Sequence, residues 1–337
     1  MFRALTHAKP SMGWFARDCP MDFVLILWGL KARCGKTPMK SIYVAVLLGC
    51  ALLASTASAQ TKPLDGVIDI HVHVAPDSIP RSIDAIDLAR LAQSRGMRAI
   101  VIKNHYEPTA STAYLVHKIV PGIQVFGGID LNLSVGGMNP EAVEKMALTT
   151  GQVGKLVWMG TNDTRAQVER SKDQRPYVAV SRNGELLPET KAVIAMIAKY
   201  HLVMATGHNS AEEDLLLIRE ARRQGVTEMV ATHPMLSPTS MTIPQMQEAA
   251  GLGAYLEFVY NGLIGTGKQF DFSDYAKAIR GAGVDHCILS SDMGQVGNPL
   301  HPDGLQLLFD GLKKQGFTQE EIDQMSKVNP ARLLGLQ

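Results

Sequence analysis

The chain has 337 residues, of which 46% are hydrophobic and 19% charged, a composition that excludes a disordered chain and supports a sizeable core. Its 33 lysines and arginines nearly balance 32 acidic residues, so the overall charge gives no electrostatic reason to expect a nucleic-acid partner. Four cysteines are too few for a disulfide scaffold in a chain of this length.

Residues 39–59 have the composition of a secretory signal peptide. Lys40 supplies a positive charge, residues 42–54 form an apolar run, and the small residues 57–59 offer a cleavage site before Gln60. The apolar run is too short to span a bilayer as a stable helix. We therefore expect cleavage, export to the periplasm or the medium, and a mature chain without a stable membrane span.

Two alternatives to cleavage at this site stay open. The segment could be a buried N-terminal helix, or residues 47–50 could be a lipoprotein box that acylates and anchors Cys50. Residues 1–38, upstream of Met39, are expected to be a mis-assigned start or a disordered extension. Removal of the leader would leave Cys287 as the one cysteine of the mature chain, which excludes an internal disulfide.

From residue 67 onward, short apolar runs alternate with amphipathic stretches. Strands are expected at residues 67–71, 98–103, 124–130, 155–159, 202–206, 228–231, 255–258 and 287–290. Helices are expected at residues 83–95, 111–119, 140–148, 188–200, 211–224, 243–250, 272–282 and 302–315. Eight strands that alternate with eight helices predict an α/β fold, namely a (β/α)8 TIM barrel that forms one domain over residues 60–337. A doubly wound sheet is the alternative.

Two segments after the fourth strand depart from this alternation. Residues 177–187 are typical of a β-hairpin, with Asn183 and Gly184 at its turn. We expect this insertion to lie over the C-terminal mouth of the barrel. The mixed charges of residues 163–175 predict a solvated loop.

Metal-ligating residue types occur at the ends of several predicted strands. His71 and His73 are two residues apart at the end of the first strand, so their side chains point to the same side. His208, His233 and Asp292 end the fifth, sixth and eighth strands. Barrel active sites lie at these C-terminal strand ends, and imidazole and carboxylate groups bind metals. Taken singly, each residue could instead be a loop histidine or a helix cap.

This ordered set resembles the metal site of the amidohydrolase superfamily of metal-dependent hydrolases. The segment from Asn329 to Leu336 is also similar to the closing helix of that family. The resemblance implies metal binding by His71, His73, His208 and Asp292, and it places His233 at the second-metal or substrate-polarising position. It implies catalytic roles for Asp292 and His233. Within the superfamily, the chain is most similar to an uncharacterised amidohydrolase-like family.

One feature departs from the family pattern. Many members with two metals carry a carboxylated lysine or a glutamate at the end of the fourth strand, but Lys155 lies near the beginning of that strand. Lys103, at the end of the second strand, could be a carbamate bridge, a cation that binds a substrate anion, or a rim lysine. One or two divalent ions therefore remain open. Zn²⁺ is expected, and Mn²⁺, Fe²⁺ and Ni²⁺ also suit imidazole ligands.

Four further residues are candidates for substrate binding: His105, Tyr106, Arg81 and Trp158. His105 shares one strand face with Lys103, and Arg81 could meet an anionic group or be a solvated loop arginine. The others could simply pack the rim of the barrel.

The expected function is hydrolysis of an amide, lactone or related ester bond in a small molecule by a metal-activated water, with Asp292 as proton acceptor. Phosphoester hydrolysis also stays open. The alternatives are a metal-dependent non-oxidative decarboxylase of the same superfamily and a non-catalytic exported ligand-binding barrel. We expect a small-molecule substrate and no nucleic-acid partner, and a homo-oligomer stays open. Asp69 or Thr206 is expected to orient the imidazoles.

Overall fold

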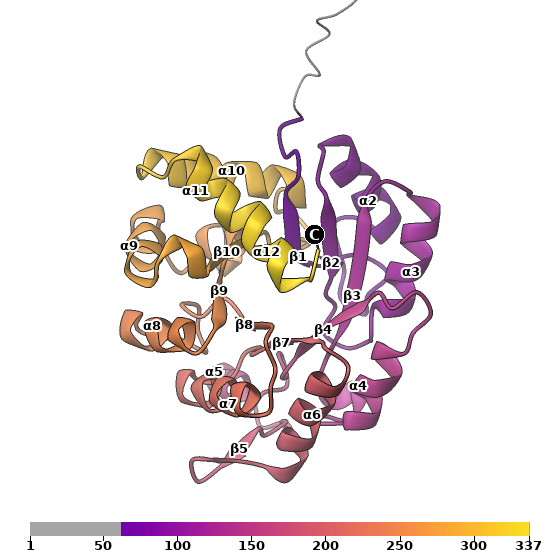
Figure 1. The fold of residues 1–337 in the computed structure, drawn as a ribbon, viewed down its shortest axis with the longest axis vertical. Helices are drawn as coiled ribbons and strands as arrows, with labels where there is room; N and C mark the ends of the chain where they lie inside the picture. The colour runs from indigo at the N-terminus through magenta and orange to yellow at the C-terminus, as the bar shows by residue number, and fades with distance from the viewer. Residues whose placement is uncertain (1–61, 337) are drawn as a thin grey trace, which may run out of the picture. The chain divides into compact units, whose positions relative to one another are not determined.

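The computed structural model describes residues 62–336. The predicted leader, Cys50 and the upstream extension lie outside the described residues and stay predictions. Within the described part, eight parallel strands form the centre of the fold and helices surround them (Figure 1). Their order is β1-β2-β3-β4-β7-β8-β9-β10, and a parallel bridge between Val72 and Met293 joins the last strand to the first. The predicted (β/α)8 barrel is confirmed.

All eight barrel strands are almost completely buried, because helices cover their outer face and side chains fill the interior. The strands are β1 (Ile68–Val72), β2 (Ala99–Ile102), β3 (Gln124–Asp130), β4 (Gly154–Trp158), β7 (Val203–Ala205), β8 (Met229–Ala231), β9 (Ala254–Val259) and β10 (Cys287–Ser290). The predicted ranges 124–130 and 287–290 match, and the other strands differ by one residue at one or both ends.

Eight helices alternate with these strands and surround them (Figure 1). They are α2 (Ala85–Ser94), α3 (Ala110–Ile119), α4 (Pro140–Ala147), α6 (Pro188–Lys199), α7 (Ala211–Arg223), α8 (Ile243–Gly251), α9 (Phe272–Ala282) and α10 (His301–Lys314). Local signals start several of them. Asn139 caps α4, and Ser210 forms a capping box with Glu213 at the start of α7. The chain continues into α11 (Gln319–Asp323), a π-helical turn (Gln324–Val328) and α12 (Asn329–Leu333).

The charged stretch 163–175 is not the solvated loop that its composition predicted. It contains helix α5 (Arg165–Ser171), whose first turn is capped because Thr164 Oγ1 accepts a hydrogen bond from the backbone N–H of Gln167. Asp163 is buried and pairs with Arg175. The prediction was wrong because these charges are used in local pairing. Helix α5 brings the side chains of Gln167 and Arg170 to the mouth of the barrel.

The predicted hairpin insertion is confirmed as β5 (Ser181–Arg182) and β6 (Glu185–Leu186). Asn183 and Gly184 turn the chain in the left-handed region, at φ values of 53° and 80°. Ser181 Oγ donates a 2.7 Å hydrogen bond to Glu213 at the start of α7, which anchors the insertion near the C-terminal end of the barrel. No helix in residues 62–336 has the length and apolar character needed to cross a membrane.

Candidate active site

Five potential metal ligands from four barrel strands line one cavity of about 190 Å³. His71 and His73 come from the end of β1, and His208, His233 and Asp292 follow β7, β8 and β10. All five therefore lie at the C-terminal end of the barrel, where the loops of a TIM barrel build its active site. The structure brings together the whole set that the strand ends predicted.

The backbone has unusual positive φ values at or next to three of these residues, just after their strands end. His233 and Asp292 have positive φ values of 27° and 51°, a conformation that non-glycine residues rarely adopt and that often occurs at functional sites. His208 follows Gly207, whose φ is 78° and whose added Cβ would collide with the carbonyl oxygen of Gly160. Only glycine fits at this position, and it fixes the point from which His208 enters the cavity.

Asp292 is the acidic centre of the cluster. Its Oδ1 lies 3.0 Å from Nε2 of His73 and 3.2 Å from Nε2 of His71, and its Oδ2 accepts a hydrogen bond from Asn261. Burial alone would raise the pKa of this carboxyl group, but His71, His73 and His233 hold the pKa of Asp292 well below its usual range. The side chain is therefore a buried anion surrounded by imidazoles.

Glu257, in β9, holds the other side of the His71 ring. Its carboxylate lies 3.2 Å from Nδ1 of His71. A carboxylate accepts only, so Nδ1 carries the proton, and the neutral ring then presents a lone pair on Nε2 toward Asp292. Two acceptors 3.2 Å apart repel each other unless a proton or a metal ion lies between them. Although burial opposes it, Asp292 and Glu257 raise the pKa of His71.

The remaining ligands also suit a divalent cation. Burial lowers the pKa of His73 and of His208 well below the usual value and that of His233 to about 4, which keeps these rings neutral, as metal binding requires. Buried ring nitrogens of all four histidines lack a hydrogen-bond partner among the described residues. Donor atoms of His71, His73 and Asp292 lie within 4.8 Å of one another. The residues present therefore fit a metal ion.

A second polar group lines the same cavity beside the histidines. Lys103, after β2, is buried with its Nζ 3.5 Å from Asp130 Oδ2, and the ring of His105 lies 4.9 Å from that of His73. Thr161 Oγ1 donates to Asp130, so it must accept the 2.9 Å hydrogen bond from Nδ1 of His105. His105 thus points an unprotonated Nε2 away from this network, because burial and Lys103 lower its pKa to about 4.

Three candidates for substrate binding lie outside the cavity lining. The Arg81 side chain is 4% exposed and its Nε pairs with Asp77 at 2.6 Å, so it is not the solvated loop arginine that was the alternative. The Tyr106 hydroxyl accepts a hydrogen bond from Asn162. Trp158 is buried behind the site, with its ring centroid 6.4 Å from that of His71.

Several supporting residues differ from those expected to orient the imidazoles. Asp69 instead accepts hydrogen bonds from the backbone N–H groups of His71 and Ser291, which ties β1 to β10. Thr206 donates to Asp214. Sequence reasoning missed the orienting roles of Glu257 and Asp130, although a carboxylate inside an apolar strand is itself a signal. His301 begins α10, and its Nε2 lies 3.0 Å from the carbonyl oxygen of His73.

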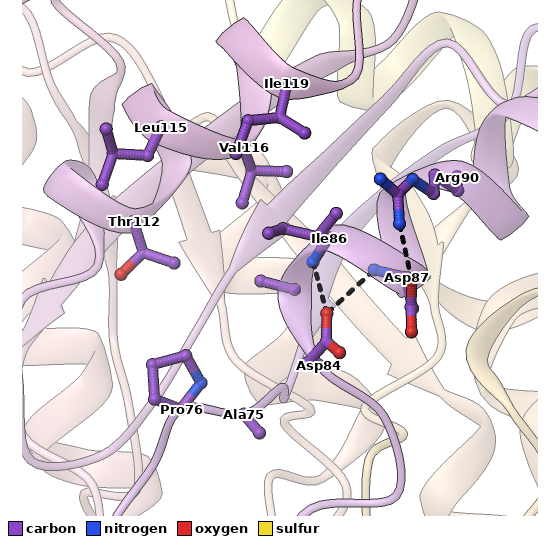
Figure 2. Close-up of a pocket in the computed structure, with 11 residues that line it drawn as sticks. Ala75, Pro76, Asp84, Ile86, Asp87, Arg90, Thr112, Leu115, Val116 and Ile119 are labelled. Atoms are coloured by element: carbon purple, nitrogen blue, oxygen red, sulfur yellow. Dashed lines mark hydrogen bonds and ion pairs between the residues drawn. The ribbon is translucent and has the colours of Figure 1, made fainter. Parts of the chain in front are cut away.

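A larger hollow of about 560 Å³ lies between α2 and α3 (Figure 2). Its wall is apolar, with Leu115 and Ile119 half exposed. Its charged side chains are already used: Asp84 caps α2 by accepting from two backbone N–H groups, and Asp87 pairs with Arg90 (Figure 2). None of the metal-ligand candidates lines this hollow, which therefore offers no chemistry comparable to that of the smaller cavity.

Comparison with known sequences places the chain in a family. Residues 66–257 match the model of a family of unknown function, DUF6282, and this match covers more than half of the chain. The chain belongs to the DUF6282 family. The match includes four of the five potential ligands, all except Asp292. No curated protein matches this DUF6282 member in sequence.

Solved structures share the fold of this DUF6282 barrel, and they are amidohydrolase-superfamily proteins. A probable dipeptidase from Pseudomonas aeruginosa is 11% identical with a TM-score of 0.58, over 82% of this chain and 96% of that one. A phosphotriesterase-like lactonase variant from Deinococcus radiodurans is 18% identical with a TM-score of 0.55, over 84% of this chain and 99% of that one. A 2,6-dihydroxybenzoate decarboxylase from Rhizobium is 12% identical with a TM-score of 0.50, over 80% of this chain and 99% of that one. At these identities the likeness is one of fold.

Proposed function

We propose that the protein is a metal-dependent hydrolase that cleaves an amide, lactone or related ester bond in a small molecule. The observation that carries this proposal is the convergence of four histidines and Asp292 on one cavity at the C-terminal end of the barrel. A purely structural zinc site is closed by four ligands. Five potential ligands around an accessible cavity instead suit a site that holds a metal and admits a substrate.

The cofactor in this proposal is a divalent transition metal, and Zn²⁺ is our first choice. His71, His73, His208 and Asp292 would hold it, with His233 either as a further ligand or directed at the substrate. When bound, such an ion acidifies water and polarises a carbonyl oxygen. Neutral imidazoles also bind Mn²⁺, Fe²⁺ and Ni²⁺, so the choice of metal rests on measurement.

The chain's own residues would then position water and move the proton. Asp292 is an anion at neutral pH, so its carboxylate can accept a proton from water and return it to the leaving group. Asn261 donates to Oδ2 of Asp292 and fixes the plane of the carboxylate. Glu257 fixes the His71 ring, which in turn faces Asp292. His233, held neutral by burial, is placed to donate to or accept from a substrate oxygen.

The solved structures support this choice of reaction, since they include a probable dipeptidase and a lactonase on the same fold. The experiment is a screen of metal-loaded protein against amides, lactones, phosphoesters and carboxylic acids, with the Asp292→Asn variant beside the natural chain. We expect hydrolysis by the natural chain and a fall in kcat of about 10²- to 10⁴-fold in the variant. Equal turnover by both proteins would remove Asp292 from the reaction.

A second candidate is non-oxidative decarboxylation, and the end of β4 favours it. No residue of this strand lines the cavity, and Lys155, half-buried near its beginning, cannot bridge two metals at its end. A decarboxylase has the same fold. Release of CO₂ from a carboxylic acid in the same screen, without hydrolysis of any ester or amide, would replace the first proposal by this one.

We also propose that the protein is exported, on the basis of the leader predicted at residues 39–59. Sequencing the N-terminus of protein recovered from the periplasm or the medium tests this. A chain that begins at Gln60 supports export by cleavage, and a chain that keeps the leader in the cytosol contradicts it. Modification of Cys50 would indicate a lipid anchor instead.

A further inference from the structure

The ammonium group of Lys103 is buried in the wall of the catalytic cavity without a hydrogen-bond partner among residues 62–336. Its side chain is completely buried, and the ring of Trp158 lies 5.5 Å from Nζ, a distance at which an aromatic face attracts a cation. A lysine has three N–H donors and no acceptor. Buried donors in native proteins are nearly always paired, so these donors indicate an acceptor that comes from outside the chain.

Asp130 does not supply that acceptor. The distance from its Oδ2 to Nζ of Lys103 is 3.5 Å, which gives attraction between charges but not a hydrogen bond of good geometry. The same Oδ2 already accepts a 2.9 Å hydrogen bond from Thr161 and lies 3.4 Å from Nδ1 of His105. Asp130 therefore attracts Lys103 while leaving its N–H groups without a hydrogen bond.

The same carboxylate argues against carboxylation of Lys103. A carbamate would replace the positive charge by a negative one about 3.5 Å from the buried anion of Asp130, and like charges at this distance strongly disfavour each other. It would also lose the attraction of the Trp158 ring for a cation. A free ammonium fits these surroundings better than a bridge between two metals.

The charged side chains that line the cavity carry more positive than negative charge. Among the described residues that line it, the charged ones are Lys103, Arg170 and Asp292, and Asp292 is surrounded by His71, His73 and Asn261. Arg170, from α5, is exposed at the rim and forms no ion pair within the described part of the chain. A cleft with cationic walls raises the local concentration of anions.

We propose that Lys103 binds a carboxylate of the substrate, so that the site takes small monocarboxylates whose reacting bond lies beside the histidines. The assignment of the reacting bond rests on the function proposed above. A carboxylate fits better than a phosphate, because a phosphate group carries nearly two negative charges and only one buried ammonium is present beside Asp130. A cavity of about 190 Å³ is also smaller than the roughly 300–1,000 Å³ of sites for drug-sized ligands.

The test is direct binding of benzoate and of its neutral counterpart benzamide, with inorganic phosphate as a separate probe. Binding is measured by calorimetry or ligand-observed NMR, on metal-free protein and on protein loaded with Zn²⁺. We expect Lys103→Met to weaken benzoate binding about tenfold or more in both forms, as loss of a charge-assisted hydrogen bond would. Benzamide binding should change less than twofold. Lys155→Met, which removes a half-buried lysine near the beginning of β4, is the matched control and should bind like the natural chain.

Lys103→Met leaves the Asp130 anion buried without a counter-ion, so the single variant could fail to fold. The double variant Lys103→Met/Asp130→Asn removes both charges and keeps an acceptor for Thr161. Circular dichroism and Zn²⁺ content then show that the barrel and its metal ligands persist. The double variant should show the same loss of benzoate binding.

Three results would overturn the proposal. The first is benzoate binding that is unchanged by the Lys103 variants or occurs only with Zn²⁺ bound. The second is Lys103-dependent binding of phosphate but not of benzoate. The third is a bicarbonate-dependent gain of one CO₂ in the mass of the natural chain that Lys103→Met lacks. If no substrate is hydrolysed but benzoate binding still depends on Lys103, the proposed function fails and this inference stands. If a substrate is hydrolysed but no binding depends on Lys103, the proposed function stands and this inference fails.

Discussion

Glu257 lies 3.2 Å from Nδ1 of His71, the ring nitrogen that does not face Asp292. The two residues are 186 positions apart in the chain, and the barrel brings them together because β9 lies beside β10, which the closing bridge joins to β1. A carboxylate in this position sets the tautomer of a metal-binding imidazole and strengthens it as a ligand.

The first prediction concerns this contact. Glu257→Ala should weaken metal binding by about 10- to 100-fold, because His71 loses the partner that fixes its ring and its tautomer. Competition between the protein and a chelator of known affinity measures the effect. Glu228→Gln, at the entry to β8 and away from the cavity, is the control. Equal metal affinity in the Glu257→Ala and natural proteins would show that Glu257 does not orient His71.

The second prediction concerns the approach of the backbone beside His208. Gly207→Ala should destabilise the fold by at least about 2 kcal/mol, the combined cost of a left-handed residue and of a clash with the backbone of Gly160. Urea unfolding measures this change. Gly225→Ala has a similar positive φ but open space around its Cβ, so it should cost only about 1–2 kcal/mol. Equal costs in the two variants would mean that the close approach to Gly160 contributes nothing.

The third prediction is a pH dependence of stability that comes from Asp214. Burial raises the pKa of this carboxyl group well above its usual value, and the nearby Glu213 adds to the effect, while the hydrogen bond from Thr206 opposes it. The native state therefore holds a proton that the unfolded chain releases above about pH 4. Stability should fall as the pH rises above this value, up to the native pKa.

Asp214→Asn removes this titration. The variant should therefore gain stability relative to the natural chain between pH 5 and pH 8, as measured by urea unfolding at both pH values. Glu212→Gln, an exposed neighbour on α7, should leave the pH dependence unchanged. A constant difference between Asp214→Asn and the natural chain at the two pH values would contradict the prediction.

The barrel could be predicted from sequence because each strand is an apolar run buried on both faces and bounded by helix caps. Parallel strands of this kind are set by short-range patterns, so β3 and β10 match their predicted bounds. The convergence of the five potential ligands on one cavity could be predicted for the same reason, since each of them lies at or just after a strand end. Helix α5 could not be predicted in this way. The segment that contains its cap and the Asp163–Arg175 pair has the composition of a solvated loop.

The contacts between ligands and their supports were beyond sequence reasoning. The pairs His71–Glu257 and Lys103–Asp130 join residues that lie in or directly after different strands. Which of these side chains face each other depends on the stagger of the barrel strands. The pairing of Arg81 with Asp77, a residue of its own loop, was likewise not evident from residue type alone. Residue type and spacing predict which groups are present, and the three-dimensional fold decides which groups meet.

Elemental analysis of protein purified without chelators tests the central claim most directly. We predict at least about one divalent transition-metal ion per chain, and its loss in a folded His71→Ala/His73→Ala variant. A natural chain that folds but holds no metal, even after exposure to excess Zn²⁺, Mn²⁺, Fe²⁺ or Ni²⁺, would contradict the account.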